Sequence, residues 1–368
     1  MGSELILEQV GNGVQLAGAE APRAVCRLAS PLADPGWDAR VTAIGGSFFH
    51  SRAWAQVLAG TYGHQPFYCV QQAGDTVVGV LPLMELNSPF LGRRGISLPF
   101  TDSCGALFQG PVAGPEDLCN FARSQALERG WRYLEFRGPV HGWRNPVPSI
   151  QFLEHVLPLA DGADRLMAGL NPAVRRAIRK SSRAGLTVSF GTSDQAMSDY
   201  YRLHALTRKR HGLPPQPERF FQNIARYVFA AGNGFVASAI LGGRTVAAAV
   251  FFFFGTEAVY KFGASDLAFQ SSRPNNLVMW EAIKWFASHG FERLHLGRTS
   301  MNNHGLAQFK RGFGAIEDRL NYFRYSLREE KWITSIDRAA DSLANSVFRR
   351  LPLPVLRLAG RILYPHVS

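Results

Sequence analysis

Apolar runs of strand length alternate with tight turns at two places in this chain of 368 residues. Such runs on either side of two or three turn residues predict β-hairpins. The first predicted hairpin spans 67–86 with its turn at Ala73-Gly74-Asp75, and the second spans 235–254 with its turn at Gly242-Gly243. The aromatic run at 251–254 predicts a buried strand, because a strand covered on both faces is continuously apolar.

Each predicted hairpin is followed by a helix that stops at a glycine and then by an apolar strand. Glycine commonly follows the end of a helix because it adopts the left-handed conformation without strain. Gly130 precedes the predicted strand 131–136, and Gly290 precedes the predicted strand 291–296. The repeated order predicts a duplicated unit of mixed sheet and flanking helices, an α/β (α+β) fold. Chance similarity between short segments is the alternative.

The chain is too long for one ordinary core, so we expect two domains and a tail. The first domain is predicted at 1–160, with Trp54 and Trp131 in its core, and the second at 161–328. The region 329–368 is a basic, amphipathic tail. It either docks as a helix on the protein body or contacts a membrane surface reversibly, and the pattern leaves both open.

The second domain is predicted to open with a basic helical segment at 164–185. Pro172 marks a helix start in this segment, and Gly185 marks a stop. Its five basic residues share one helix face, which is typical of a solvated surface; contact with an anion or an RNA backbone is the alternative. These residues are Arg175, Arg176, Arg179, Lys180 and Arg183.

The chain carries 40 Lys and Arg against 28 Asp and Glu, a formal net charge of +12. This excess favours a polyanionic partner such as nucleic acid, a nucleotide-linked substrate or an anionic lipid surface. The four cysteines lack C-x-x-C spacing, so we expect neither a metal site nor a redox dithiol. The first residues do not form a basic and apolar leader, and Gly242-Gly243 and Arg244 interrupt the longest apolar stretch. We therefore expect a cytoplasmic protein, with peripheral attachment to the inner face of the membrane as the alternative.

Three groups of motifs resemble the FemABX-like family of acyl- and aminoacyltransferases, in particular its branch associated with exosortase and exopolysaccharide systems. They follow one another in the family's order over most of the chain, and the third group is the most specific. The first group is Phe48-Phe49-His50-Ser51-Arg52-Ala53-Trp54, Tyr62-Gly63-His64, Val78-Gly79-Val80-Leu81-Pro82-Leu83 and Ser97-Leu98-Pro99-Phe100. The second is Asn171-Pro172-Ala173-Val174-Arg175-Arg176-Ala177-Ile178-Arg179-Lys180 and Thr207-Arg208-Lys209-Arg210-His211-Gly212. The third is Pro274-Asn275-Asn276, Leu296-Gly297-Arg298-Thr299-Ser300 and Phe309-Lys310-Arg311-Gly312-Phe313-Gly314-Ala315.

This resemblance implies a tandem duplicated GNAT (acyl-CoA N-acyltransferase-like) fold that transfers an acyl or aminoacyl group to an amine. In the best-known members the donor is aminoacyl-tRNA and the acceptor is a peptidoglycan precursor. Two departures weaken these literal substrates: the second half lacks a long coiled-coil insertion, and Val57-Leu58 stands where nucleotide-binding members have a lysine. We expect a small or lipid-linked peptidoglycan or exopolysaccharide precursor as acceptor, either aminoacyl-tRNA or acyl-CoA as donor, and no tightly bound cofactor.

The resemblance also nominates site residues. Lys310, together with Phe309, matches the family's Phe-Lys pair near the reacting end of the donor, which implies electrostatic stabilisation. Arg210 matches an arginine that contacts substrate phosphate, and its neighbour His211 is a candidate proton acceptor. We expect Arg210 and Lys310 to face one cationic crevice between the lobes. Further candidates for substrate binding, several of them following the predicted strand 291–296 where open sheets place ligands, are Arg298, Thr299, Asn303, Asn276 and Tyr260.

Two other functions stay open at this point. One is an acyl-CoA-dependent N-acetyltransferase, although no Q/R-x-x-G-x-G/A segment opens a helix in either half. The other is a non-catalytic basic protein that binds RNA or a membrane surface, since a fold does not determine a function. The sequence has no G-x-S-x-G elbow and no Cys–His arrangement, which favours catalysis by positioning and preformed charge over a dedicated nucleophile.

Overall fold

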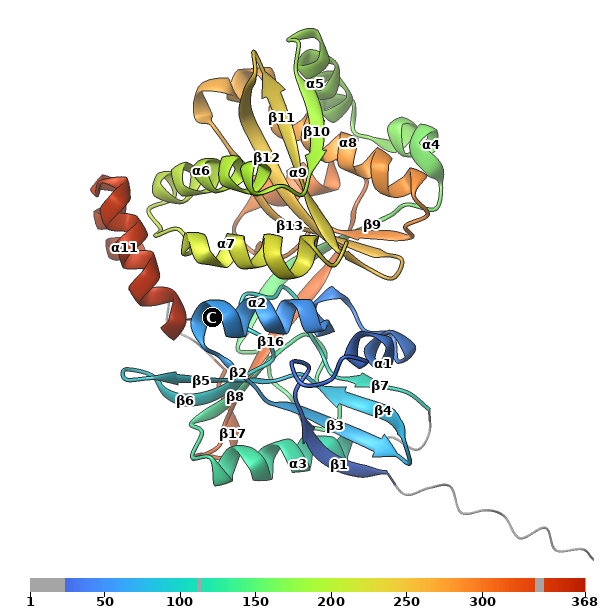
Figure 1. The fold of residues 1–368 in the computed structure, drawn as a ribbon, viewed down its shortest axis with the longest axis vertical. Coiled ribbons are helices and arrows are strands. Elements are labelled where there is room, and N and C mark those ends of the chain that lie inside the picture. Colours follow the sequence, from blue (N-terminus) through green and yellow to red (C-terminus); the bar gives the residue numbers. More distant parts are fainter. Residues whose placement is uncertain (1–23, 111–113, 335–340, 368) are drawn as a thin grey trace, which may run out of the picture.

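The computed structural model describes residues 24–110, 114–334 and 341–367. The chain forms two lobes of sheet and helices, with the first half of the sequence mainly in the lower lobe of Figure 1 and the second half mainly in the upper lobe. Both lobes mix strands and helices, as the fold class predicted from the sequence requires.

The first lobe contains a four-stranded antiparallel sheet in the order β1-β3-β4-β7, with α2 and α3 against it. Its elements are β1 (Val25–Ala29), α1 (Trp37–Ala43), the 3-10 helix η1 (Phe48–His50), α2 (Arg52–Tyr62), β2 (Gln65–Pro66), β3 (Tyr68–Ala73), β4 (Thr76–Leu81), β5 (Met84–Ser88), β6 (Gly92–Ile96), β7 (Leu107–Phe108), α3 (Pro115–Glu128) and β8 (Tyr133–Arg137).

The second lobe is built on the antiparallel run β10 to β13, which α6 and α8 cover. Its elements are β9 (Ile150–Pro158), α4 (Gly162–Gly169), α5 (Pro172–Arg183), β10 (Thr187–Gly191), α6 (Asp194–Arg210), α7 (Glu218–Ile224), the π-helical turn η2 (Ala225–Phe229), β11 (Gly234–Leu241), β12 (Arg244–Phe254), β13 (Glu257–Ser265), η3 (Leu267–Ser272), α8 (Pro274–Ser288), β14 (Arg293–His295), β15 (Thr299–Ser300), α9 (His304–Arg311) and the first part of β16 (Ile316–Ser326). The end of β16 and β17 (Lys331–Trp332) return to the first lobe.

A larger sheet runs through both lobes in the order β10-β11-β12-β13-β14-β9-β16-β8-β6-β5-β2. Strand β16 connects the two parts, because its first residues pair with β9 and its last residues pair with β8. The domain boundary predicted at residue 160 follows directly after β9 and would place this strand in the first domain. In the structure β9 pairs with β14, a strand of the second lobe. The lobes are therefore joined by a continuous ladder of backbone hydrogen bonds.

Both predicted hairpins form, as β3–β4 and β11–β12. The first is shorter than predicted because β4 ends at Leu81, before Pro82, whose nitrogen has no hydrogen to donate to a ladder. The chain then enters the large sheet as β5. Gly130 and Gly290 follow α3 and α8 with φ of 66° and 78°, so the repeated order of helix, glycine and strand is confirmed.

The predicted basic segment is two helices, α4 and α5, and not one. Leu170 between them is extended. Asn171, directly before Pro172, has a non-helical ψ of 138°, as the residue before a proline usually does, and its side chain accepts a hydrogen bond from the backbone of Ala173. Pro172 takes the first position of α5, and Gly185 follows its end with φ of 78°, as the sequence predicts.

One apolar core crosses the boundary between the lobes. Helix α2 of the first lobe packs on α7 of the second, and the ring of Phe48 stacks on that of Phe252 at a centroid distance of 4.4 Å. Trp54 is fully buried in this core, and Trp131 is buried in a neighbouring cluster beneath α3, as predicted. Phe251 is buried as well, on the opposite face of β12.

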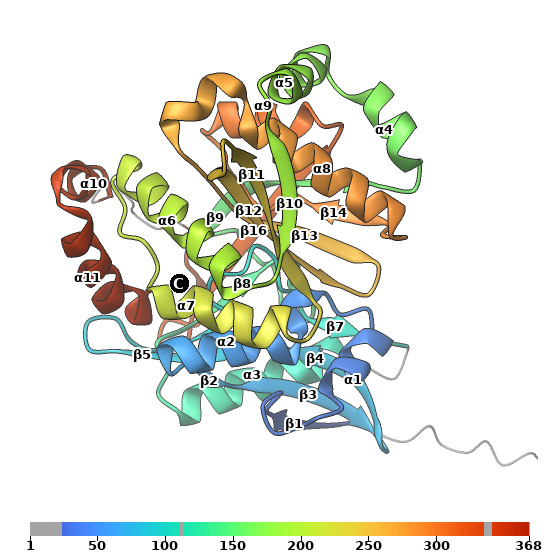
Figure 2. The ribbon, with the colours of Figure 1, turned by 45° about the horizontal axis from the view of Figure 1, so that its top comes forward.

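The tail folds into α10 (Asp341–Arg350), α11 (Leu353–Leu363) and the 3-10 helix η4 (Tyr364–His366), apart from 335–340 and 368, which lie outside the described residues. Figure 2 shows α10 and α11 beside α6. Among the helices of the described ranges, none combines the length and apolar character needed to cross a lipid bilayer.

Candidate active site

The parallel strands β13 and β14 stay together for only three residue pairs and then separate. Their ladder ends at Val259 and His295, after which β13 continues while the other chain turns away through Gly297, with φ of 70°. At the same level β13 contains a bulge, since its pairing with β12 shifts by one residue and leaves Lys261 as the extra residue. A gap therefore opens in the sheet near the carboxyl ends of two parallel strands, where open sheets bind ligands.

A cavity of about 220 Å³ lies against this gap, and both lobes line it. The first lobe contributes η1 and the segment 102–105, and the second contributes parts of β9, β13 and β14 together with Gly297 and Arg298. This volume is smaller than that of a typical site for a whole drug-sized ligand, so it suits the reacting end of a larger substrate.

Acidic side chains and a histidine lie on the cavity side of the sheet. Glu257 and Val259 lie on one face of β13, and Val259 pairs with His295 of β14. His295 in turn pairs with Val156 of β9, and Glu154 lies two residues from Val156 on the same face. His295 Nε2 lies 3.4 Å from Glu257 Oε2, and this contact lowers the pKa of Glu257. Burial and the charge of Asp318 raise the pKa of Glu154. This wall can attract an ammonium group, and Glu154, with its raised pKa, is the better proton acceptor of the two carboxylates.

A buried ion pair between the lobes forms another part of the site. Lys261 Nζ donates to Asp102 Oδ2 at 2.9 Å, and the two side chains are 5% and 17% exposed. The ammonium also lies 5.2 Å from the ring of Phe49. Burial acts to raise the pKa of Asp102, but Lys261 and Arg298 outweigh it and hold that pKa below its usual range. Burial lowers the pKa of Lys261, which Asp102 counteracts.

Arg298 is held in the cavity wall by a chain of hydrogen bonds that ends at the same aspartate. Its Nη1 donates to the Tyr322 hydroxyl at 2.9 Å, and that hydroxyl donates to the backbone oxygen of Asp102 at 2.6 Å. The guanidinium also lies 4.6 Å from the ring of Phe152. Since β16 supplies Tyr322 and β9 supplies Phe152, the shared part of the large sheet fixes this cation.

Lys310 reaches the gap from α9. It is 2% exposed, and its Nζ donates to the backbone oxygens of Gly297 at 2.6 Å and Arg298 at 3.2 Å. Burial lowers the pKa of Lys310 from 10.5 to about 8, although the charge of Asp102 opposes the fall. The folded protein thus keeps an ammonium where its charge is disfavoured, which is typical of functional lysines.

The sequence predicts a cationic crevice, and the cavity carries acidic side chains as well as a cation. Asp102, Glu154 and Glu257 line it together with Arg298. These carboxylates come from three separate parts of the chain, and the strand pairing of β9, β13 and β14 brings two of them together. The site therefore has both an acidic wall and a set of buried cations.

An open groove lies where α5, α9 and the start of α8 meet, near the top of Figure 2. Arg273 precedes α8 in the left-handed conformation, with φ of 60°. The predicted substrate-binding residues Phe309 and Asn276 line this groove, and α9 therefore contributes to it as well as carrying Lys310 to the gap. The four cations among its lining residues, which suit an anionic ligand, are Arg176, Lys180, Arg273 and Arg311.

Three other predicted residues lie close to the gap. Thr299 opens β15 and is 1% exposed, and its hydroxyl has no hydrogen-bond partner among the described residues. Asn303 caps α9, because its Oδ1 accepts from the backbone of Leu306 at 3.1 Å. Tyr260 lies on β13, where burial raises its pKa to about 12. A role in substrate binding stays a prediction for each of the three.

Arg210 and His211 stand at the end of α6 and line neither the cavity nor the groove. Burial and the nearby Arg210, Arg208 and Arg349 lower the pKa of His211, which places this turn beside α10. Lys310 is not among the residues that line the cavity either, so the expectation that Arg210 and Lys310 face one crevice stays a prediction. The individual roles predicted for Arg210 and His211 stay predictions.

Sequence reasoning missed five residues of the site: Asp102, Glu154, Glu257, Lys261 and His295. Lys261 carried a usable signal, because it is a lone cation inside a mostly apolar strand and a buried charge needs a partner. The partner, Asp102, lies 159 residues away and belongs to no recognisable motif.

The strand order, the diverging parallel pair and the duplicated unit define a tandem GNAT-like fold, with mixed sheets flanked by helices. Residues 172–311 match the family model described as an acetyltransferase (GNAT) domain, a range that includes Lys261, His295 and Lys310. No curated protein matches the chain.

Three solved structures resemble the chain over most of their length. FemX is 13% identical with a TM-score of 0.62, over 81% of this chain and 96% of FemX. A tandem GNAT protein from the clavulanic acid biosynthesis pathway is 13% identical with a TM-score of 0.53, over 83% and 98%. L-PGS from Bacillus licheniformis is 13% identical with a TM-score of 0.53, over 86% and 98%. At these identities the likeness shows the fold alone, so membership of the exosortase-associated branch stays a prediction.

Proposed function

We propose that the chain is an N-acyltransferase that joins an activated acyl or aminoacyl group to an amine at the gap between β13 and β14. One observation carries the proposal: an acid-lined cavity and the buried ammonium of Lys310 meet at this gap, near the carboxyl ends of parallel strands. The match of the GNAT family model over the same strands supports acyl transfer as the class of reaction.

The acidic wall prepares the acceptor. An ammonium group enters the cavity, where Glu154 and Glu257 attract it, and Glu154, whose pKa is raised, takes up one proton to give a neutral amine. The amine nitrogen then bonds to the carbonyl carbon of the donor, and an electron pair moves to the carbonyl oxygen. When this tetrahedral intermediate collapses, the electron pair on oxygen re-forms the carbonyl and the bond to the leaving alkoxide or thiolate breaks. The amine nitrogen loses its second proton, and the leaving group takes up that proton.

The buried cations stabilise the negative charge that develops on the carbonyl oxygen. Lys310 contacts the backbone of Gly297 at the gap, and with a pKa of about 8 it is mostly protonated at neutral pH. A preorganised donor of this kind typically contributes about 10²- to 10³-fold in rate. No covalent intermediate with the protein is required, which agrees with the absence of a nucleophile motif in the sequence.

The open groove is the proposed donor site, because α9 lines it and also reaches the gap. Aminoacyl-tRNA and acyl-CoA both carry phosphates that Arg176 and Lys180 can bind. The proposed acceptor is a peptidoglycan or exopolysaccharide precursor. The resemblance to FemABX-like proteins supports an envelope substrate, as does a fold neighbour named as a putative lysylphosphatidylglycerol synthetase, which is 15% identical with a TM-score of 0.53.

Donor and reaction are tested in two stages. Thermal-shift titration of coenzyme A and of charged tRNA identifies the donor, and an Arg176→Gln/Lys180→Gln variant is expected to weaken whichever binds. Single-turnover transfer to amine acceptors is then compared between the wild type, Lys310→Met and the exposed control Lys284→Met, and only Lys310→Met is expected to lose turnover. Donor binding without transfer to any amine would instead favour a non-catalytic binding protein.

A further inference from the structure

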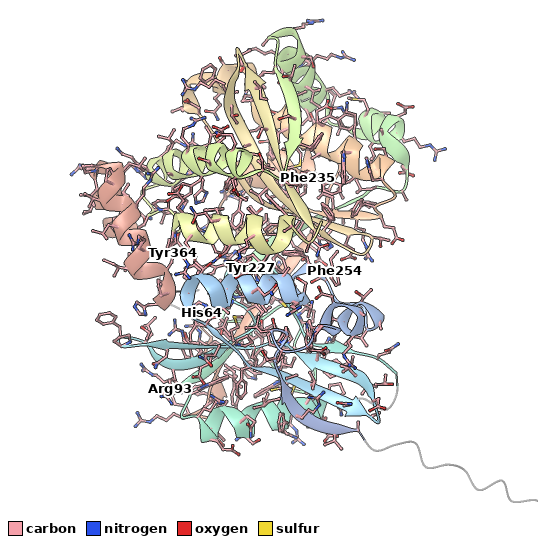
Figure 3. All side chains as sticks on the ribbon, in the orientation of Figure 1. His64, Arg93, Tyr227, Phe235, Phe254 and Tyr364 are labelled. Carbon is pink, nitrogen blue, oxygen red and sulfur yellow. The ribbon has the colours of Figure 1, made fainter. Side chains whose placement is uncertain are left out.

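Helix α11 has an inner face that docks on the second lobe. Leu356, Gly360 and Tyr364 follow one another at intervals of four residues, and Leu356 is fully buried. A Cβ atom on Gly360 would lie 2.0 Å from the backbone oxygen of Pro215, so only glycine permits this close approach. The Tyr364 hydroxyl donates to the backbone oxygen of Pro214 at 3.1 Å, and Figure 3 labels this tyrosine at the junction with the body.

The outer face of the same helix is apolar and exposed. Val355, Leu358 and Ile362 are 46%, 56% and 59% exposed, and their spacing places them on one side of the helix. Val347 on α10 is 59% exposed as well. An amphipathic helix normally turns its apolar stripe toward the core. Because the inner face already serves that purpose here, the outer stripe is not needed for folding.

The hairpin between β5 and β6 adds two apolar residues on the same side of the molecule. Phe90 and Leu91 at its tip are 84% and 44% exposed. The hairpin is fixed to the end of the tail, since Arg94 Nη2 donates to the backbone oxygen of His366 at 2.6 Å and the Phe90 ring lies edge-on to His366. Figures 1 and 2 both show this hairpin and α11 on the same side.

Cations accompany this apolar surface. Arg349, Arg350 and Arg361 are exposed on α10 and α11. Over 341–367 the sequence contains four arginines and a single acidic residue, Asp341. Exposed apolar residues bordered by arginine are the combination that binds an interface carrying anionic headgroups.

We propose that α10, α11 and the tip of the β5–β6 hairpin form a docking face for an anionic lipid bilayer, with α11 lying in the plane of the interface. The apolar residues enter the boundary between headgroups and acyl chains, and the arginines bind lipid phosphates. At 11 residues, α11 is about 16 Å long, so it lies on the bilayer and does not span it. A second copy of the chain is a poorer occupant, because it would set arginines against arginines in a protein of net charge +12. The inference does not depend on the proposed enzymatic activity.

Cosedimentation of the full chain with vesicles tests this docking face. The protein is expected to bind vesicles that contain phosphatidylglycerol and to leave pure phosphatidylcholine vesicles largely unbound. Leu358→Glu/Ile362→Glu is expected to weaken binding at least about tenfold, since it places charge in the buried face. Arg349→Gln and Arg350→Gln are each expected to weaken binding about fivefold, from about 1 kcal/mol per arginine.

Leu127→Glu is the control, because Leu127 is 48% exposed on α3, a helix outside the proposed docking face, and its substitution is expected to leave binding unchanged. Circular dichroism melting of each variant separates loss of binding from loss of folding. Equal binding by the wild type and Leu358→Glu/Ile362→Glu would overturn the proposal, as would equal affinity for neutral and anionic vesicles. A third outcome would also overturn it: light scattering shows a wild-type dimer, Leu358→Glu/Ile362→Glu is a monomer, and neither protein binds vesicles.

Discussion

Replacement of Lys310 by methionine distinguishes a functional lysine from a structural one. The change removes the ammonium but keeps a side chain of similar length in a site that is 2% exposed. Burial lowers the pKa of Lys310 from 10.5 to about 8, so at pH 7 the folded protein holds the charged form at a cost of about 3 kcal/mol. Methionine cannot donate to the backbone oxygens of Gly297 and Arg298, and leaving these acceptors unsatisfied costs the variant about 2 kcal/mol if each costs about 1 kcal/mol.

The two contributions nearly cancel, so Lys310→Met is expected to change the free energy of unfolding by no more than about 1 kcal/mol, toward greater stability. Turnover is expected to fall by at least about 10²-fold, because the proposed oxyanion loses one of the buried cations that stabilise it. The direction in which the stability of the wild type changes with pH also follows from this pKa. Between about pH 8 and 10.5 the unfolded lysine binds a proton that the folded one has released, so the wild type gains stability with rising pH and the variant does not.

Urea denaturation at pH 7 and at pH 9.5, together with single-turnover kinetics, measures both effects. Lys284→Met on the surface of α8 serves as the control for removing one positive charge. If Lys310→Met lowers the free energy of unfolding by more than about 3 kcal/mol, the lysine stabilises the fold and the expected near-cancellation is wrong. Unchanged turnover would refute the catalytic role even if stability behaved as expected.

Three further predictions follow from the same geometry. Asp102→Asn leaves Lys261 buried without its partner and is expected to lower the free energy of unfolding, measured in urea, by about 3 to 5 kcal/mol. Adding Lys261→Met is expected to recover part of this stability, and no recovery would show that the two side chains are not coupled. Glu257→Gln is expected to raise KM for the amine at least about tenfold with little change in melting temperature, and an unaltered KM would remove this residue from the acceptor site. If Lys310 acts as a cation, the rate falls as pH rises through about 8, where it loses its proton, and a pH–rate profile that stays level to pH 9.5 would contradict this.

Much of the fold could be predicted because its signals are local. A glycine turn between two apolar runs defines β11–β12 without reference to the rest of the chain, and Gly130 and Gly290 end their helices for a reason contained in a few residues. The same holds for Pro172 at the start of α5. The duplicated order of such elements was sufficient to predict two similar lobes.

The shared sheet could not be predicted in the same way. Strand β16 pairs with β9 and β8, both from the first half of the sequence, and this register depends on packing across the whole molecule. The predicted boundary at residue 160 therefore does not indicate that β9 before it and β14 after it pair in one sheet.

The site was only partly predictable for a related reason. Lys310 and Arg298 belong to a short segment that carries a family motif, and both lie at the gap. Asp102 has no such context, and its relation to Lys261 exists only after the lobes have packed. Arg210, which a matched motif nominated for the site, lies at the end of α6 and does not line the cavity, and its role stays a prediction.

The most direct test of the central claim, that the gap between β13 and β14 is a site of acyl transfer, is mass spectrometry of the products of single-turnover reactions. Wild type and Lys310→Met are each incubated with coenzyme A thioesters or charged tRNA and with amine-bearing envelope precursors. An acylated or aminoacylated amine is expected with the wild type, and at least about 10²-fold less of it with the variant. Equal product from both proteins, or no acylated amine with either donor, would contradict the claim.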